Sequence, residues 1–295
     1  MRVFLTGATG FIGSHIVPLL LEAGHQVLGL ARSDTGAKQL AAAGAEVHRG
    51  DLADPSTLRS GAERADAVIH CAFDHDFSRF VDNCQKDRRN IEAMGEALAG
   101  SARPLVITSG VGMGSPRPGE LAREDVFDTA HPNPRKISEE TGVAVAAARG
   151  VNVSYVRLPQ VHDRRKQGLI TSLVEIARAK GRVAYLGEGN NRFSAAHVTD
   201  VARLYKLAVE RGEPGARYHA VAEEGVPMRE VAAALGRSLR LPVASLSPDE
   251  AAGYFGWMAT FAAFDLPASS ALTQKKLGWK PVGPGLIADL ENLET

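Results

Sequence analysis

The sequence predicts an α/β fold in which helices cover both faces of a parallel β-sheet. Two observations lead to this prediction. Short apolar stretches rich in β-branched residues alternate with helix-length segments through the first half of the chain, as buried parallel strands alternate with their crossover helices. The first apolar stretch, residues 2–6, also runs straight into a glycine-rich turn that opens a helix, which is how a doubly wound sheet commonly begins.

The expected strands are short and apolar, and most are bounded by Gly, Asp or Pro, residues that interrupt strands. They are residues 2–6, 26–31, 46–48, 65–71, 104–109 and 152–158. The helices expected between them are residues 11–23, 35–43, 56–61, 79–99 and 136–148.

After residue 158 the alternation loosens, and we expect a smaller C-terminal lobe packed on the sheet. Its expected helices are residues 169–179, 200–211, 227–239, 248–263 and 269–277, and its expected strands are residues 182–186 and 217–221. Residues 253–258, with Phe261 and Phe264, are aromatic and apolar. They fit a substrate-pocket wall, the core or a subunit contact.

The glycine-rich turn has the spacing of a pyrophosphate-binding site. One glycine permits the tight turn, one lets the backbone approach the phosphates, and one lets the helix pack close to the strand. The helix N-terminus then offers free N–H groups and a positive dipole end to the anion. We therefore predict a Rossmann-type NAD(P)-binding domain over residues 1–160, to which the chain returns near 194–222, and a mainly substrate-binding lobe over 161–295. The turn residues expected to contact the nucleotide are Gly7, Thr9, Gly10, Phe11, Ile12 and Gly13.

Further short motifs follow TGATGFIG (residues 6–13) in a characteristic order. They are RGDL at 49–52, HCAF at 70–73, ITSG at 107–110, RLPQVH at 157–162, AHVTDVA at 196–202 and LGWKP at 277–281. In this order they resemble the extended or atypical short-chain dehydrogenase/reductase superfamily, which includes sugar-nucleotide epimerases and dehydratases. The resemblance implies further cofactor contacts from Asp51, Leu52, Cys71, Ala72, Phe73, Thr108 and Pro159.

The end of the second strand favours NADP over NAD. NAD enzymes usually carry an acidic residue about 20 residues past the glycines, where it holds the ribose hydroxyls. Here the strand ends with Arg32 and Ser33, and a planar guanidinium suits a 2′-phosphate. Asp34 is expected to cap the next helix. Arg32 could also be no more than a solvated surface residue near adenine.

The resemblance also implies a catalytic Ser/Thr, Tyr and Lys, and here the sequence departs from the pattern. Ser109 takes the Ser/Thr position, but no tyrosine precedes the expected helix near residue 136. If Glu139 matches the family's helix glutamate, His131 replaces Tyr and Arg135 replaces Lys. If Glu140 matches it instead, Lys136 takes the lysine position, so we retain Lys136 as a candidate catalytic residue.

A proton donor must then come from another residue. His162 stands where the R-P-x-x-V-Y motif of the family brings its tyrosine toward the nicotinamide, and an imidazole can donate a proton near pH 7. A packed histidine is the alternative. His131 is a second candidate. His75 is a third, and its flanking acids, Asp74 and Asp76, are expected to raise its pKa.

These observations predict an NADP-dependent oxidoreductase acting on a small carbonyl, imine or alkene. The alternatives are a sugar-nucleotide-like epimerase or dehydratase with retained cofactor, and a non-catalytic NAD(P)-sensing protein. Thirty-four basic residues balance 34 acidic ones, so we expect no nucleic-acid or membrane partner. The opening residues lack a secretory pattern, and Cys71 and Cys84 form no CxxC pair. We expect a cytoplasmic protein without metal, and a homodimer is plausible from the resemblance.

Overall fold

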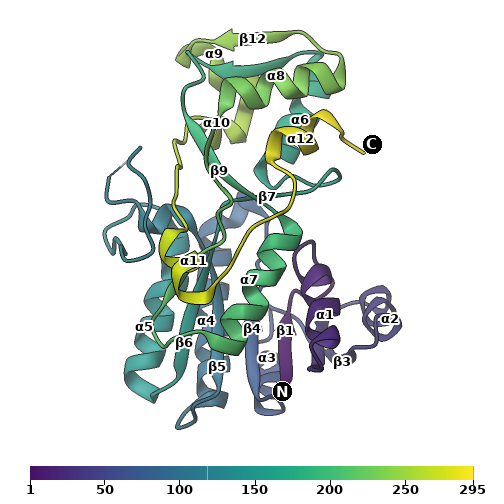
Figure 1. Ribbon diagram of the computed structural model, residues 1–295, viewed down its shortest axis with the longest axis vertical. Helices are drawn as coiled ribbons and strands as arrows, with labels where there is room; N and C mark the ends of the chain where they lie inside the picture. Colours follow the sequence, from purple (N-terminus) through teal and green to yellow (C-terminus); the bar gives the residue numbers. More distant parts are fainter. Residues whose placement is uncertain (118, 295) are drawn as a thin grey trace.

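The computed structural model describes residues 1–117 and 119–294. Its centre is a sheet of seven strands in the order β10-β6-β5-β4-β1-β2-β3, with every neighbouring pair parallel (Figure 1). This arrangement confirms the predicted α/β, Rossmann-type fold. The strands are β1 (Arg2–Thr6), β2 (Gln26–Ala31), β3 (Glu46–Arg49), β4 (Ala67–His70), β5 (Pro104–Gly110), β6 (Asn152–Leu158) and β10 (Arg217–His219).

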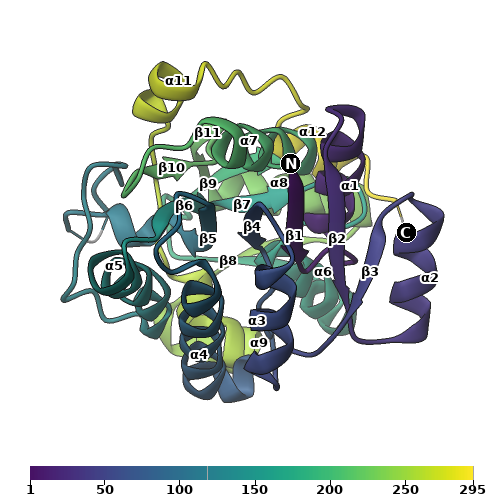
Figure 2. The same cartoon turned by 90° about the horizontal axis from the view of Figure 1, so that it is seen from below.

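Helices cover both faces of this sheet because successive strand residues bury their side chains on opposite faces. Phe4 packs in one core and Leu5 in the other. One face carries α3, α4 and α5 side by side, and the other carries α1 packed on α7 (Figure 2). Their bounds are α1 (Gly13–Glu22), α2 (Asp34–Ala42), α3 (Pro55–Glu63), α4 (Phe80–Leu98), α5 (Ile137–Arg149) and α7 (Val198–Arg211).

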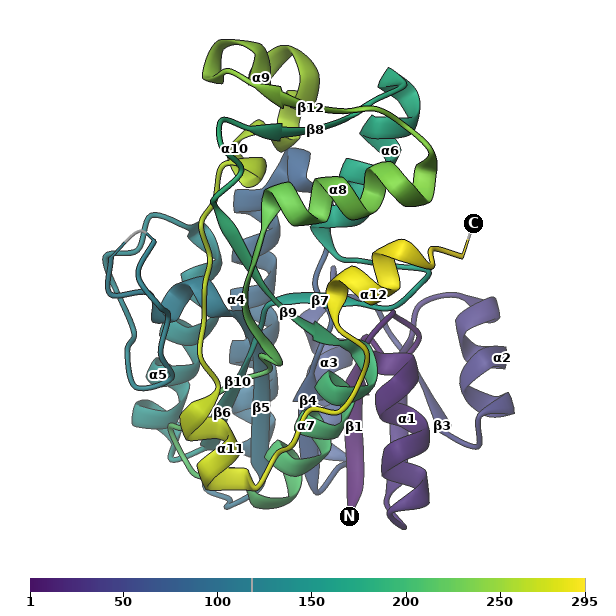
Figure 3. The ribbon, with the colours of Figure 1, turned by 45° about the horizontal axis from the view of Figure 1, so that its top comes forward.

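A smaller lobe lies beyond the carboxyl ends of the parallel strands (Figures 1 and 3). Its two-stranded sheet pairs β8 with β12 in parallel. Helices α6, α8 and α9 pack around this sheet with a core of their own, which includes Leu173, Val231 and Leu235. The bounds are α6 (Leu169–Lys180), β8 (Val183–Leu186), α8 (Met228–Leu239), β12 (Val243–Leu246) and α9 (Pro248–Phe255).

A three-stranded sheet joins the two parts of the molecule, and the sequence did not predict it as a unit. It contains β7 (Gln160–His162), β9 (Arg192–His197) and β11 (Glu223–Pro227) in the order β11-β9-β7. The strand β9 pairs in parallel with β7 and antiparallel with β11. These strands are three to six residues long, too short for periodicity alone to identify them.

The C-terminal region is more broken than predicted. The helix expected over 248–263 stops at Gly256, whose φ of +55° lies in the region that favours glycine. Two short turns, η4 (Gly256–Met258) and α10 (Ala259–Ala262), follow it. The chain then descends to α11 (Ala271–Leu277) and climbs back along the sheet to α12 (Leu286–Glu291), which packs on α8 (Figure 1).

The predicted cap of α2 is wrong, and a histidine caps α7. Ser33, not Asp34, caps α2, because its Oγ accepts the N–H of Gly36 at 3.1 Å. His197 caps α7 through its Nδ1, which accepts the N–H of Thr199 at 3.3 Å. Asp200, in the first turn of α7, is buried and accepts backbone N–H groups from the C-terminal segment, including that of Gly283 at 2.7 Å.

None of the helices in the described residues combines the length and apolar character that crossing a membrane requires.

The remaining short helical turns are η1 (Phe77–Arg79), η2 (Val111–Gly114) and η3 (Pro134–Lys136). Of these, η1 follows β4 and η3 precedes α5. Both therefore lie next to the candidate functional site.

Candidate functional site

The turn between β1 and α1 forms a cradle of free backbone N–H groups. Gly7 adopts a φ of +70°, and its carbonyl accepts the N–H of Gly10 at 2.9 Å. A Cβ placed on Gly13 would overlap the Gly7 carbonyl oxygen, so only glycine lets α1 begin this close to β1. Within the described residues, the N–H groups of Phe11 and Ile12 have no acceptor. They are therefore available to bind a phosphate at the positive end of the helix.

Replacing Gly13 with alanine is expected to lower the free energy of unfolding by roughly 2–4 kcal/mol, because the new Cβ must displace backbone atoms rather than a flexible side chain. Urea denaturation measures this change. Gly253→Ala is the matched control, since nothing lies within 4 Å of a Cβ at that helical position and alanine there is neutral or slightly stabilising. Equal denaturation midpoints for the two variants would contradict this account of the turn.

The carboxyl ends of β2 and β3 present two arginines. The Arg32 side chain is 81% exposed, with its Nε 3.8 Å from the Asp51 carboxylate. In the β2–β3 register Arg49 lies opposite Ala31, the residue before Arg32, and it pairs with Asp34. Arg49 was not predicted as a site residue, although its place at the end of β3, as the first residue of RGDL, was a usable signal.

The predicted adenine-side residues lie around the same edge. The carboxylate of Asp51 accepts the N–H of Ala53 at 2.9 Å, and the carbonyl of Leu52 accepts a hydrogen bond from the Asn90 side chain at 3.2 Å. Thr9 packs against the first turn of α2, because a Cβ on Gly36 would come within 3.2 Å of its methyl group. The first turn of α2 therefore lies directly against the glycine-rich turn.

A chain of buried polar groups connects the end of β1 to the start of α5. Thr6 Oγ1 lies 2.7 Å from His70 Nδ1, and His70 Nε2 lies 3.0 Å from Asp87 Oδ1. The other Asp87 oxygen accepts hydrogen bonds from Arg135 Nη1 and Ser138 Oγ, both at 2.6 Å. Burial alone would raise the pKa of Asp87, but the Arg135 guanidinium, helped by His70 and Ser138, holds it well below its usual range.

The residues that follow β4 are close to both ends of this chain. The N–H of Ala72 donates to Thr6 Oγ1 at 3.2 Å, and a Cβ on Gly7 would come within 2.9 Å of that same nitrogen. The ring of Phe73 lies over the Arg135 guanidinium, with its centroid 4.1 Å away. Cys71 is half-buried, and burial raises the pKa of its thiol to about 11. This thiol is therefore not an activated nucleophile.

The two hydroxyls at the end of β5 are both turned away from solvent. Thr108 Oγ1 donates to the carbonyl of His70 at 2.7 Å and lies 2.6 Å from Tyr205 OH. The Ser109 hydroxyl is buried and makes no hydrogen bond of good geometry among the described residues, although it helps to lower the pKa of Glu139. The next residue, Gly110, has no hydroxyl. Pro159, on the neighbouring strand connection, is half-buried.

The structure separates Arg135 from Lys136. Arg135 enters the buried chain and also donates to the carbonyl of Thr108 at 3.1 Å. Lys136 donates to the carbonyl of Thr129 at 2.6 Å and lies 3.8 Å from Glu140 at a more exposed position. The contacts therefore favour Arg135 for the lysine position and the sequence alignment in which Glu139 is the helix glutamate.

Glu139 is fully buried and holds two arginines in place. Its carboxylate accepts hydrogen bonds from Arg157 Nε and Nη2 at 2.7 and 2.8 Å, and from Arg217 Nε at 2.7 Å. Burial opposes the charged form, but these guanidinium groups keep the pKa of Glu139 below its usual value. Burial, together with the positive charge of Arg157, lowers the pKa of the adjacent His219 to about 3, so this histidine stays neutral.

Two candidate proton donors differ in their surroundings. His75 contacts the rings of Phe73 and Phe77, with centroids 5.5 and 6.1 Å apart. The expectation of a raised pKa is wrong, because desolvation and then the Arg135 charge lower it and outweigh the opposing effect of Asp74. The Asp74 carboxylate itself pairs with Lys86 at 2.7 Å. The Nδ1 of His131 accepts the N–H of Asn133 at 3.1 Å, and burial lowers the pKa of that imidazole.

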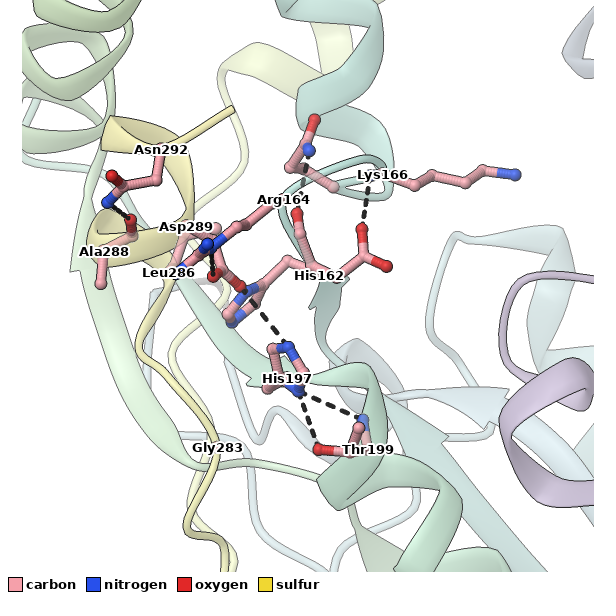
Figure 4. Close-up of polar contacts among 12 residues, drawn as sticks. His162, Arg164, Lys166, His197, Thr199, Gly283, Leu286, Ala288, Asp289 and Asn292 are labelled. Atoms are coloured by element: carbon pink, nitrogen blue, oxygen red, sulfur yellow. Dashed lines mark hydrogen bonds and ion pairs between the residues drawn. The ribbon is translucent and has the colours of Figure 1, made fainter. Parts of the chain in front are cut away.

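His162, a third candidate donor, is buried against the C-terminal segment (Figure 4). Its Nδ1 lies 2.7 Å from Asp289 Oδ2, and His197 Nε2 lies 3.8 Å from the same oxygen. Burial lowers the pKa of His162, and the Asp289 carboxylate only partly offsets this. These contacts link His162 to α12 and β9, and its Nε2 is buried without a hydrogen-bond partner among the described residues.

The glycine turn, the β4 and β5 ends and the superfamily motifs agree with a comparison to known families. The family model described as "NAD dependent epimerase/dehydratase family" matches residues 3–221. The chain belongs to this family. The predicted resemblance to the extended short-chain dehydrogenase/reductase superfamily is thereby confirmed. The family binds NAD(P), which also confirms the prediction of an NAD(P)-dependent oxidoreductase.

Individual relatives span different activities. The "Uncharacterized protein C2A9.02" of Schizosaccharomyces pombe is 46% identical over 291 residues, 98% of each chain. The 2-alkyl-3-oxoalkanoate reductase of Stenotrophomonas maltophilia is 29% identical over 249 residues, 78% of this chain and 73% of the relative. The structure of a dTDP-glucose 4,6-dehydratase from Streptomyces venezuelae, with NAD and TYD bound, superposes with a TM-score of 0.77 at 20% identity, covering 99% of this chain and 95% of that one. This last likeness shows the fold alone.

The buried polar chain contains residues that sequence reasoning missed. Thr6 and His70 are the last residues of β1 and β4, and polar side chains at the ends of otherwise apolar strands were a usable signal. Asp87 lies within α4 beside other charged residues, so the sequence does not mark it as a site residue. Its pairing with Arg135, 48 residues further along the chain, leaves no local pattern in the sequence.

Proposed function

We propose that this protein is an NADP-dependent reductase that converts a small ketone or related carbonyl compound to the alcohol. The preference for NADP is supported by the exposed Arg32 at the carboxyl end of β2, with Arg49 on the adjacent strand. A pair of guanidinium groups suits a 2′-phosphate. The carboxylates that contact Arg32 and Arg49, those of Asp51 and Asp34, are themselves exposed to solvent. Imine or alkene substrates remain within the same proposal.

The bound nucleotide would supply a hydride to the carbonyl carbon, while the carbonyl oxygen takes up a proton. The free N–H groups after Gly10 would hold the pyrophosphate. Arg135 would hold the nicotinamide ribose or the substrate oxygen, since Asp87 and Thr108 fix the orientation of its guanidinium. We propose His75 as the proton donor, because it lies beside Phe73, the ring that covers Arg135. The buried hydroxyl of Ser109 would act only indirectly.

Exchange of the charge at Arg32 tests the proposed cofactor. Arg32→Asp is expected to weaken NADPH binding about 10–100-fold, since a hydrogen bond to a charged group contributes roughly 1.5–3 kcal/mol, while NADH binding is retained or improves. Nicotinamide fluorescence titration measures both dissociation constants. Arg59→Asp is the control, because Arg59 pairs with Glu63 and Glu96 on another part of the surface. Equal loss for both nucleotides would argue against a 2′-phosphate contact.

Proton donation by His75 predicts a pH dependence. Its pKa is lowered from 6.5, so the protonated donor is present below that lowered pKa and is lost as the pH rises through it. The rate of ketone reduction at saturating NADPH is therefore expected to fall as the pH rises through a value below 6.5. His75→Asn should remove this inflection, and His131→Asn should leave it in place. The opposite pattern would transfer the proton-donor role to His131.

A redox-neutral epimerase or dehydratase is the second candidate function. The family match and the dehydratase-like fold favour it. It requires a base at the oxidised carbon, and no tyrosine stands in the segment before α5. Net oxidation of NADPH by a ketone distinguishes the reductase from this candidate and from a non-catalytic sensor. A homodimer and a cytoplasmic location stay predictions of the sequence.

A further inference from the structure

A partly exposed group of aromatic side chains lies beside the proposed reaction centre. We call it the aromatic cluster. Its rings form a continuous series of contacts with centroids 5.5–6.1 Å apart, and they come from both the β4–α4 connection and the C-terminal lobe. Figure 3 shows the N-terminal end of α4 reaching up to α10, where these two parts meet. The members of the cluster are Phe73, Phe77, Phe80, Trp257, Phe261 and Phe264.

The exposure of this cluster is unusual for its composition. The chain has ten phenylalanines and two tryptophans, and half of these twelve side chains lie in the cluster. None of the six is fully buried, and Trp257 is 55% exposed. Phe4, Phe193, Phe255 and Trp279, in contrast, are in the cores. Large aromatic side chains grouped at a surface and left out of the core commonly mark a binding site.

The cluster has one polar end. Phe73 lies over the Arg135 guanidinium, and His75 contacts both Phe73 and Phe77. At the other end, Phe77 and Trp257 stack with their planes 20° apart and their centroids 5.5 Å apart. A ligand that fits this arrangement has a flat apolar body and a single oxygen for Arg135 or His75.

The charges around the cluster do not suit a diphosphate. The carboxylate of Asp74 is paired with Lys86, and Asp76 caps η1 through the N–H of Ser78. Beside Phe264, Asp265 pairs with Arg192. Arg135, Lys86 and Arg192 are each matched by a carboxylate, and the one other cation that acts on His75 is the exposed Lys166. A second pyrophosphate would therefore meet little uncompensated positive charge among these residues.

We propose that the aromatic cluster is the substrate site, and that it takes uncharged, flat, apolar ketones and excludes sugar nucleotides. The flat body would lie against Phe77 and Trp257, with the carbonyl oxygen toward Arg135. This inference rests on the proposed reductase function and narrows its substrate class. A second copy of the chain is the alternative occupant of such a surface.

Tryptophan fluorescence tests the substrate site without requiring turnover. The two tryptophans are Trp257, which is exposed, and Trp279, which is 1% exposed and buried under α7. The protein is first saturated with NADP⁺, and this binding is measured separately. It is then titrated with 1-indanone, a flat aromatic ketone, and in parallel with UDP-glucose. We expect saturable quenching by 1-indanone, no response to UDP-glucose, and no quenching in Trp257→Phe, which retains Trp279 as its reporter of folding.

Substitutions at the cluster sharpen the test. Phe77→Ser is expected to weaken 1-indanone binding at least tenfold and leave NADP⁺ binding unchanged. Val282→Ser, at an exposed apolar position outside the cluster, should change neither. Quenching by UDP-glucose, or none by 1-indanone while NADP⁺ binds, would overturn the substrate site. Conversion of a dimer to a monomer by Trp257→Ser in sedimentation velocity would overturn it in favour of a contact between copies. Failure of NADP⁺ to bind would instead reject the proposed function.

Discussion

Replacing Arg135 with methionine is expected to reduce kcat/KM for NADPH-dependent ketone reduction by about 100-fold or more. Loss of one preorganised donor at a reaction centre commonly costs 10²–10³-fold. Arg135 is such a donor because its guanidinium is fixed by Asp87 on one side and by the Thr108 carbonyl on the other. Initial rates over a range of ketone concentrations, at saturating NADPH, measure this loss.

The adjacent cation provides the control. Lys136→Met removes a charge one residue away, but Lys136 contacts the carbonyl of Thr129 outside the buried chain, so its kcat/KM should change by less than about threefold, the scatter expected for a surface substitution. Arg135→Lys keeps the charge but cannot reach Asp87 and Thr108 with one planar group, and it should recover only part of the rate. A larger effect at Lys136 than at Arg135 would restore Lys136 to the catalytic position.

Substitution of Asp87, the buried partner of Arg135, distinguishes an effect on the position of the Arg135 guanidinium from an effect on folding. Asp87→Asn should lower kcat more than it raises KM, because it frees the Arg135 guanidinium without removing it. His70 and Ser138 would still bind the amide, so the fold should persist. If Asp87 and Arg135 act as one unit, the double variant should lose little more activity than Arg135→Met alone, as coupled residues do.

Much of the nucleotide half could be predicted because its signals are local. The strands β1, β2 and β5 are apolar runs of five to seven residues, and the spacing of Gly7, Gly10 and Gly13 specifies the turn that follows β1. Backbone geometry requires glycine at positions 7 and 13, because Gly7 has a positive φ and a Cβ on Gly13 would overlap the Gly7 carbonyl. Such constraints act within a few residues of chain and are therefore visible in a single sequence.

The rest depended on contacts between distant residues. The position of Arg135 is decided by Asp87 on α4, and the site of His162 is decided by Asp289, 127 residues away. The motif around His162 therefore predicted a catalytic position from neighbouring residues. Its actual partner in the structure, Asp289 on α12, could not be predicted from that motif. Distant contacts also decide which aromatic residues of 253–258 are buried. Tyr254 and Phe255 lie in the core, but Trp257 is exposed.

Glu139→Gln is expected to lower the free energy of unfolding by about 3–5 kcal/mol at pH 7, the usual cost of removing one partner from a buried ion pair. The amide would leave Arg157, which is fully buried, without its countercharge. Glu140→Gln is the matched control, because the neighbouring carboxylate is partly exposed and lies 3.8 Å from Lys136. It should cost no more than about 1 kcal/mol.

The pH dependence gives this prediction a second test. The folded-state pKa of Glu139 is held below its ordinary value of 4.5, so its charged form stabilises the fold above about pH 4.5, and that stabilisation is lost as the pH falls through the lowered pKa. The difference between wild type and Glu139→Gln in urea denaturation should therefore be constant from pH 6 to 7 and shrink in strongly acidic solution. Arg157 Nη1 also donates to the carbonyls of Arg123 and Val126. If Glu139→Gln and Glu140→Gln lower the free energy of unfolding equally at every pH, these carbonyls alone satisfy Arg157. The ion pair would then orient the β6 and α5 ends without stabilising them.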